Sequence, residues 1–158
     1  MIFLECNNDE FLIKSLGFSR KQIFHVYNKG EVVKRVGKAV NAIGIIDKDL
    51  DRDRPKAMSE YIEVKNNRAN GDIVLLQKKD DKQKKLVQIS PYLEHWLLNR
   101  AKKNKINPKN FDLPDDPKKL HALTKLESNK KFQKFLGKLI ETDSEIQTLK
   151  KWIEDALG

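Results

Sequence analysis

Four aspartates follow the apolar segment 42–46 and alternate with other residues: Asp47, Asp49, Asp51 and Asp53. In an extended chain this alternation places Asp47 and Asp49 on the same side. Paired carboxylates supply the oxygen ligands that hard divalent cations take, and without a cation their mutual repulsion would raise their pKa values. The segment therefore predicts a site for Mg²⁺ or Mn²⁺. The alternative is a solvated acidic turn, where Asp is a common residue.

A further acid, Glu5, ends the apolar segment at the start of the chain. A simple turn after a buried strand would use Gly, Asn or Ser, whereas an acid at the end of such a strand needs a partner. Glu5 therefore favours the metal site over the acidic turn, provided that the fold brings it beside Asp47.

The elements that must position these acids follow from the hydrophobic pattern. Residues 2–5, 23–27 and 42–46 are expected to be strands, and helices are expected after an N-cap at Asn7 or Asn8 and over residues 31–40. This β-α-β-α-β order predicts an α/β fold with a mostly parallel sheet flanked by helices. In such sheets functional groups gather at the carboxyl ends of the strands, where both Glu5 and Asp47 are expected.

The rest of the chain predicts further strands and then helices. Strands are expected over 61–65, 73–77 and 86–89, with a loop over 78–85, and helices over 92–103, 118–127, 129–140 and 143–156. We therefore divide the chain into an α/β domain, residues 1–104, and a helical C-terminal extension packed on it, residues 105–158.

The net charge of +9 is unevenly distributed. Residues 1–60 carry +2 and residues 61–158 carry +7. The C-terminal part is therefore expected to attract a polyanion such as DNA or RNA, although Lys-rich helices also serve solubility alone. One cysteine, Cys6, fits a reducing cytoplasm, and the sequence has neither a signal-peptide pattern nor an apolar run long enough for a membrane span.

Two segments resemble the motifs of the Toprim family, which includes topoisomerases, bacterial primases and several nucleases. Residues 3–10 (FLECNNDE) are similar to the first motif, an acid after strand one followed by an acid that opens a helix. Residues 44–51 (GIIDKDLD) are similar to the second, an apolar strand that ends in Asp-x-Asp. Cys6 stands where the family usually has Gly. The resemblance implies a Toprim-like, Rossmann-like fold over about the first 65 residues.

The chain looks most similar to standalone or nuclease-type members, including the overcoming-lysogenization-defect nucleases and related phage-defence proteins. That resemblance implies Mg²⁺- or Mn²⁺-dependent hydrolysis of phosphodiester bonds, with Glu5, Asp47 and Asp49 as catalytic and metal-binding residues. It adds Asp51, Asp53 and Glu94, in the segment ISPYLEHWLL, as further metal ligands. Larger relatives carry an ATPase domain or have it supplied by a partner protein. The expected partners are therefore DNA or RNA and a partner ATPase. Phosphate contacts are expected from basic side chains near the acids: Lys29, Lys48, Arg52 and Arg54.

Several alternatives stay open. Glu94 could simply be an acid favoured by a helix dipole, and each basic residue could be a solvated surface charge. Asp9 is expected to cap a helix or to support a metal ligand, and His25, His95 and His121 are expected to be structural because they lack metal-ligand spacing. As a whole, the chain could be a non-catalytic module that keeps the fold and binds nucleic acid or a protein in a regulatory or phage-defence role.

Overall fold

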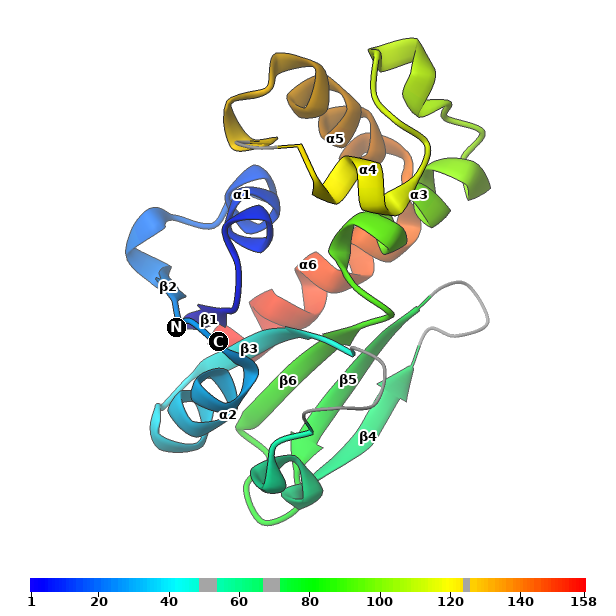
Figure 1. Ribbon diagram of the computed structural model, residues 1–158. Helices are drawn as coiled ribbons and strands as arrows, with labels where there is room; N and C mark the ends of the chain where they lie inside the picture. Colours follow the sequence, from blue (N-terminus) through cyan, green and yellow to red (C-terminus); the bar gives the residue numbers. More distant parts are fainter. Residues whose placement is uncertain (49–53, 67–71, 124–125) are drawn as a thin grey trace.

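The computed structural model describes residues 1–48, 54–66, 72–123 and 126–158, and shows an α/β fold around one sheet (Figure 1). The six strands lie in the order β2-β1-β3-β6-β5-β4, and β2, β1, β3 and β6 are parallel, whereas β5 and β4 run antiparallel. Their bounds are β1 Ile2–Leu4, β2 Ile23–His25, β3 Ala42–Asp47, β4 Tyr61–Asn66, β5 Ile73–Lys78 and β6 Lys84–Ile89. The predicted mostly parallel sheet with flanking helices is therefore confirmed.

Helices connect and cover these strands. The α-helices are α1 Asn7–Ser15, α2 Lys29–Lys38, α3 Leu93–Lys103, α4 Pro117–His121, α5 Lys130–Thr142 and α6 Ser144–Leu157. Short 3₁₀ helices are η1 Arg20–Gln22, η2 Lys56–Glu60, η3 Pro108–Phe111 and η4 Leu126–Ser128. The first half of the chain thus follows the predicted β-α-β-α-β order.

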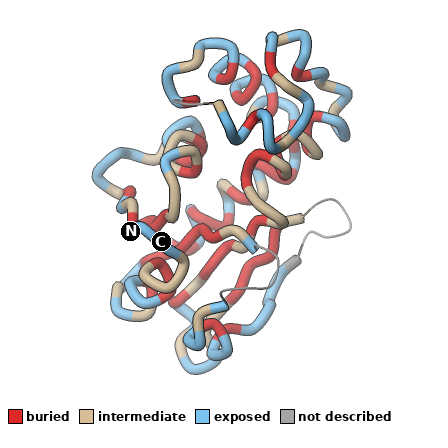
Figure 2. The backbone as a smooth tube through the Cα atoms, in the orientation of Figure 1, coloured by how far each residue is buried: buried red, intermediate tan, exposed pale blue. Residues whose placement is uncertain are grey.

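The two faces of the sheet contribute to two separate hydrophobic clusters. One face packs against α2 and η2, with Val32, Val36 and Met58 at its centre. The other face packs against α1, α3 and α6 in the larger cluster, which α5 joins through α3 and α6. Figure 2 shows the buried backbone concentrated in the strands and in the inward sides of these helices. The central strand β3 is buried from Ala42 to Ile46 because both faces are covered.

The C-terminal helices share the larger cluster with the sheet. In Figure 1, α4 lies beside α3, α5 lies in the part of the molecule away from the strands, and α6 runs back toward β3. Within the cluster, Phe132 and Phe135 of α5 and Trp152 of α6 are buried together with Ile45 of β3. The predicted helical extension is thus joined to the α/β part by a continuous apolar core.

Some predicted element boundaries are wrong. The N-cap of α1 is Cys6 rather than Asn7 or Asn8. Helix α2 begins at Lys29, capped by Asn28, and ends before Val40, which is 66% exposed. Strand β6 begins at Lys84, inside the predicted loop 78–85. The predicted helix 118–127 is instead the short helix α4 followed later by η4.

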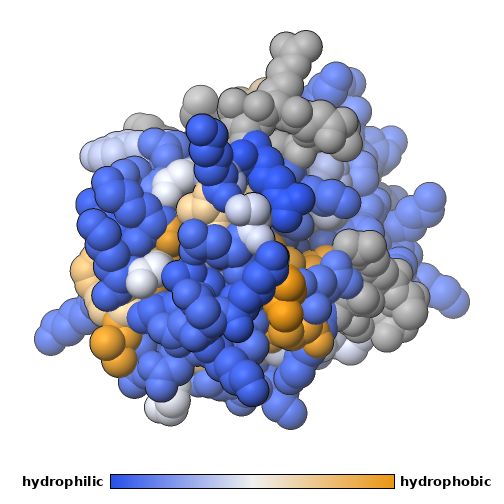
Figure 3. Space-filling model, turned by 90° about the horizontal axis from the view of Figure 1, so that it is seen from below, coloured by the Kyte–Doolittle hydropathy of each residue, from blue (hydrophilic) through white to orange (hydrophobic). Residues whose placement is uncertain are grey.

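The outer surface is largely hydrophilic. Seen from below in Figure 3, charged and polar residues cover most of the face, and apolar residues show in small groups between them. Among the described residues, the large apolar side chains that are most exposed are Tyr27 and Val40. The helices formed by the described residues are too short or too polar to cross a bilayer.

Candidate active site

Glu5 and Asp47 meet at the carboxyl edge of the sheet. Strands β1 and β3 are parallel neighbours, with Leu4 opposite Ile45, so the residues that follow them lie side by side. The carboxylate Oε2 of Glu5 accepts a hydrogen bond from the backbone N–H of Asp47 at 3.2 Å. Both residues are partly buried. The predicted juxtaposition of these two acids, 42 positions apart, is therefore confirmed.

Asp9 lies beside this pair and closes the N-terminus of α1. The backbone N–H of Asp9 donates to Cys6 Sγ at 3.5 Å, and the backbone N–H of Cys6 donates to Asp9 Oδ2 at 3.3 Å, a reciprocal capping box. The expected capping role of Asp9 is confirmed. Cys6 adopts φ −133° and ψ 165°, an extended conformation open to any residue, so this turn does not require the Gly that is usual in the Toprim motif.

The side chain of Asp9 is buried, and its Oδ1 has no hydrogen-bond partner among the described residues. Burial, helped by the nearby carboxylates of Glu94 and Glu5, raises the pKa of Asp9 to about 7, against the hydrogen bonds from Cys6. Burial, followed by the charge of Asp9, also raises the pKa of the Cys6 thiol above its usual range. Cys6 is therefore a neutral thiol that caps a helix, and the negative charge of the site comes from carboxylates.

Glu94 joins the site from α3. It lies in the first turn of that helix, yet the residue is only 3% exposed. Its Oε1 accepts a hydrogen bond from Asn8 Nδ2 at 2.7 Å and lies 3.2 Å from His121 Nδ1. The sequence left Glu94 as either a metal ligand or an acid favoured by a helix dipole. The structure is compatible with both, because Glu94 lies at the N-terminal end of α3 and also faces the acidic residues of α1.

Asn8 and His121 are the site residues that the sequence did not single out. The sequence indicates Asn8 only as a possible N-cap, and His121 only as a structural residue. Their roles depend on contacts with Glu94, which is 86 positions away from Asn8. Asn8 lies within residues 3–10, where the acids alone carry the resemblance, and His121 stands in no motif, so the sequence holds no signal for this contact.

The predicted ligand set falls partly outside the described residues. Asp49, Asp51, Arg52 and Asp53 lie in the segment 49–53, which the structure does not describe. Within residues 1–48, 54–66, 72–123 and 126–158, no three His, Cys, Asp or Glu side chains come close enough together to hold a metal ion. The described carboxylates alone therefore do not form a complete metal-binding cluster.

Two of the described basic candidates lie at the same edge of the sheet. Lys29 is the first residue of α2, directly after the turn that follows β2. Lys48 follows β3 and is exposed, and its backbone N–H donates to the carbonyl oxygen of Ile89 at 2.7 Å. Arg54 is also exposed. Lys29 and Lys48 thus flank the strand ends that carry Glu5 and Asp47.

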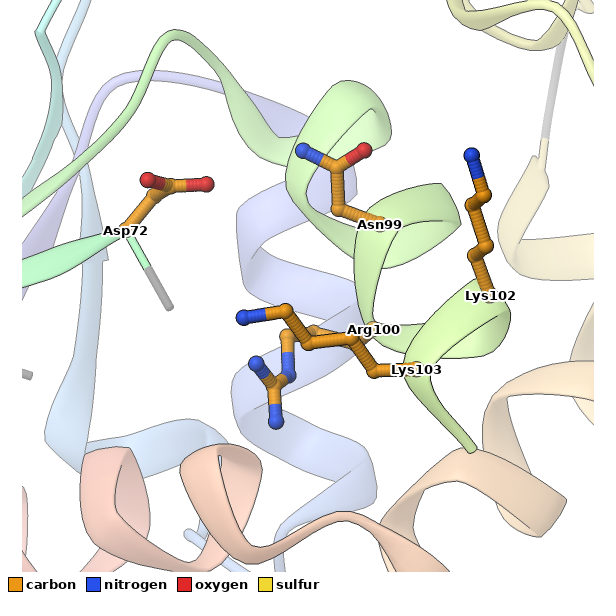
Figure 4. Close-up of a pocket in the computed structure, with 5 residues that line it drawn as sticks. All are labelled: Asp72, Asn99, Arg100, Lys102 and Lys103. Carbon is orange, nitrogen blue, oxygen red and sulfur yellow. The ribbon is translucent and has the colours of Figure 1, made fainter. Parts of the chain in front are cut away.

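A pocket of about 380 Å³ opens between the start of β5 and helix α3. Figure 4 shows Asp72 on one side, with Asn99, Arg100 and Lys103 extending toward it from α3 and Lys102 projecting in a different direction. The floor of the pocket is fixed, because the buried Arg100 pairs with two buried acids of the C-terminal helices. The polar rim of the pocket therefore rests on a rigid base.

The base is an ion-pair network that fastens α6 to α3 and β5. Arg100 Nη2 lies 2.7 Å from Asp143 Oδ1, and Arg100 Nη1 lies 2.8 Å from Glu145 Oε2. Glu145 Oε1 also accepts hydrogen bonds from the indole N–H of Trp96 and from the backbone N–H groups of Asp72 and Ile73. These contacts satisfy buried charge, so the network is structural.

In comparisons with known proteins, no family model matches the chain, and neither the curated proteins nor the solved structures include a match. The functional argument therefore rests on the geometry of the site.

Proposed function

We propose that this protein is a divalent-cation-dependent nuclease of the Toprim type, which hydrolyses phosphodiester bonds in DNA or RNA at the acidic edge of its sheet. The observation that carries the proposal is the hydrogen bond from the Asp47 backbone to the Glu5 carboxylate, which brings two acids from separate strands to one point. Buried Asp9 and Glu94 add two further carboxyl groups around it.

The electrostatics of the site support a bound cation. Burial is the main cause of the raised pKa of Asp9, and the nearby carboxylates of Glu94 and Glu5 add to it, because crowded carboxyl groups destabilise each other's charged forms. A hard divalent cation offsets this repulsion and takes carboxylate oxygens as ligands. The unpartnered Oδ1 of Asp9 is such an oxygen. The donor chemistry therefore fits Mg²⁺ or Mn²⁺, with Asp49 as a further ligand expected from the sequence.

The residues of the site would each have a separate role in phosphodiester hydrolysis. Glu5, oriented by the Asp47 N–H, accepts or donates the proton that moves during hydrolysis, and the Asp47 and Asp49 side chains hold the cation. Glu94, fixed by Asn8, supplies further negative charge beside Asp9. Lys29, Lys48, Arg52 and Arg54 bind phosphate groups of the substrate. The cation, when bound, neutralises the scissile phosphate and lowers the pKa of the attacking water.

Cleavage assays test this proposal directly. The protein is incubated with Mg²⁺ or Mn²⁺ and with labelled single-stranded DNA, supercoiled plasmid and RNA, and each reaction is repeated with EDTA. We expect cleavage of at least one substrate that EDTA abolishes and that Glu5→Gln removes. Glu141→Gln, at an exposed acid on α5, is the matched control and should cut like the parent. Equal cutting by the parent and Glu5→Gln would sink the proposal.

Two observations favour a second candidate, a non-catalytic module that binds nucleic acid or a partner protein in a regulatory or phage-defence role. The described residues hold no complete metal-binding cluster, whereas residues 93–142 hold 12 Lys and Arg against 6 Asp and Glu, a net charge of +6. This candidate predicts salt-sensitive binding of DNA or RNA without metal-dependent cleavage, or capture of a partner such as an ATPase. The assays above separate the two candidates.

A further inference from the structure

A row of polar and aromatic side chains begins at the acidic site and extends from it along the exposed side of α3. It consists of Tyr92, His95, Asn99, Lys102 and Lys103, together with His121 of α4, and we call it the α3 track. Residues 92, 95, 99 and 103 follow one another at intervals of three or four positions, which places them on one side of a helix. The opposite side of α3 is buried in the hydrophobic cluster.

Direct contacts link the members of the α3 track. The rings of Tyr92 and His95 lie 5.9 Å apart, and those of Tyr92 and His121 lie 6.2 Å apart, both pairs in edge-to-face geometry. His95 Nδ1 and Asn99 Nδ2 lie 3.2 Å apart. Asn99 then lines the pocket of Figure 4 with Lys102 and Lys103. The contacts therefore run from the aromatic rings to Asn99, and the wall of the pocket continues the track to the two lysines.

The aromatic end of the α3 track touches the acidic site. His121 Nδ1 lies 3.2 Å from Glu94 Oε1, and its side chain is 69% exposed. Tyr92, which packs against His121, is half-buried. A strand lying along α3 would thus enter the acidic site past these two rings. Tyr92 to Lys103 spans about 16 Å along the helix axis, the length of about five phosphates in a stacked strand.

We propose that the α3 track binds a single strand of nucleic acid, with a base stacked on the ring of Tyr92 beside His121 and the following phosphates held by Asn99, Lys102 and Lys103. The inference rests on the proposed function and specifies its substrate as single-stranded. Aromatic faces stack on bases that are not already stacked in a duplex, and the exposed Lys102 and Lys103 supply positive charge for the phosphates. Asp72, on the facing wall of the pocket, keeps the phosphates on the α3 side.

Binding measurements on a protein that does not cut test this inference. Fluorescence anisotropy is recorded for the Glu5→Gln protein, without divalent cations, with a labelled single-stranded DNA, the matching RNA strand and the DNA duplex. We expect tighter binding of a single strand than of the duplex. Tyr92→Ala should weaken single-strand binding at least about fivefold, whereas Tyr92→Phe should bind within about twofold of the parent, because the ring supplies the stacking.

The lysines have their own readout and matched control. Lys103→Ala should weaken binding and reduce the dependence of log Kd on log salt by about one unit. Lys82→Ala removes an equal charge from the turn between β5 and β6, at the other edge of the sheet, and should leave both quantities unchanged. Far-UV circular dichroism establishes that each variant is folded.

Three results would overturn the inference. These are tighter binding of the duplex than of either single strand, unchanged binding in Tyr92→Ala, and binding of a polyglutamate peptide through the same residues in place of the oligonucleotides. Failure of the proposed nuclease function is distinguishable, because binding is measured without cleavage. Single-strand binding through Tyr92 and Lys103 in a protein that never cuts would support the track and contradict the nuclease.

Discussion

The Glu5 carboxylate is oriented by the backbone N–H of Asp47, at 3.2 Å, and not by the Asp47 side chain. The distinction matters because a backbone donor survives substitution of its own side chain. The position of Glu5 is therefore built into the pairing of β1 with β3. The chemistry of Asp47 can be removed while the placement of Glu5 is kept.

Asp47→Asn should consequently separate catalysis from folding. The substitution keeps the backbone N–H and the shape of the side chain but removes the negative charge. We expect cleavage to fall by at least about 100-fold, because loss of a group that only supports a metal ligand already costs about 10- to 100-fold, with little change in the thermal unfolding midpoint. Initial cleavage rates in Mg²⁺ and differential scanning fluorimetry check both halves. A variant that cuts at the parent rate would show that Asp47 takes no part in catalysis.

The raised pKa of Asp9 predicts how stability depends on pH. The folded protein holds the Asp9 proton up to about pH 7, whereas the unfolded chain releases it near pH 3.8. This contribution to stability is thus complete below about pH 4 and is lost as the pH rises to about 7. The difference between a pKa of about 7 in the folded protein and 3.8 in the unfolded chain corresponds to about 4 kcal/mol.

Asp9→Asn removes this titration while keeping an oxygen that can accept the Cys6 N–H. We expect the variant to be more stable than the parent at pH 8, by up to about 4 kcal/mol, and about equally stable at pH 4. Urea unfolding at both pH values measures the difference. Comparison with the parent cancels other groups with the same trend, such as Glu145, whose pKa is raised by burial. Parallel pH profiles would contradict the account.

The sequence predicted the strands that carry the site but not the side-chain contacts within it. The strand ends of β1 and β3 were predictable because short apolar segments followed by acids form a strong local pattern. Strand β6 was predicted two residues too short because it begins with Lys84 and Lys85. Lys84 is buried, and its amine reaches the carbonyl oxygen of Ala39. The burial of a charged residue at the start of a strand is a tertiary effect that local pattern does not reveal.

The same reason explains the missed site residues. Glu94 carried two open interpretations because its burial depends on Asn8 and His121, which come from α1 and α4. Their proximity follows from the packing of α4 on α3 and of the helical part on the sheet, which no spacing in the sequence encodes. The metal-binding roles of Asp49 and Asp51 remain predictions, since these residues lie outside the described part of the chain.

Gly44 lets α2 lie close against β3, and its replacement tests that packing. A Cβ at this position would lie 2.5 Å from Val32 Cγ1 and 2.7 Å from Leu86 Cδ2. We expect Gly44→Ala to destabilise the protein by about 1–3 kcal/mol, as overpacking of a core does. Gly37→Ala is the matched control, since a Cβ added there would meet no atom within 4 Å, and helix propensity should make it stabilising by up to about 1 kcal/mol. Equal midpoints in urea would disprove the close approach.

Arg100 holds the C-terminal helices to the α/β part. Arg100→Ala leaves the buried carboxylates of Asp143 and Glu145 without their cation, so we expect a loss of about 3–5 kcal/mol in the free energy of unfolding. Lys102→Ala, at an exposed neighbour on the same helix, should change it by less than about 0.5 kcal/mol. Chemical denaturation of both variants measures the contrast. Similar small effects would mean that the network contributes little to stability.

Mn²⁺ binding tests the central claim, a cation site at the acidic edge of the sheet, most directly. Crystals soaked in Mn²⁺ should show an anomalous difference peak within coordination distance of Glu5 and Asp47, and crystals of Glu5→Gln should show a weaker peak or none. A peak elsewhere, or no peak at a saturating Mn²⁺ concentration in crystals of the parent, would contradict the claim.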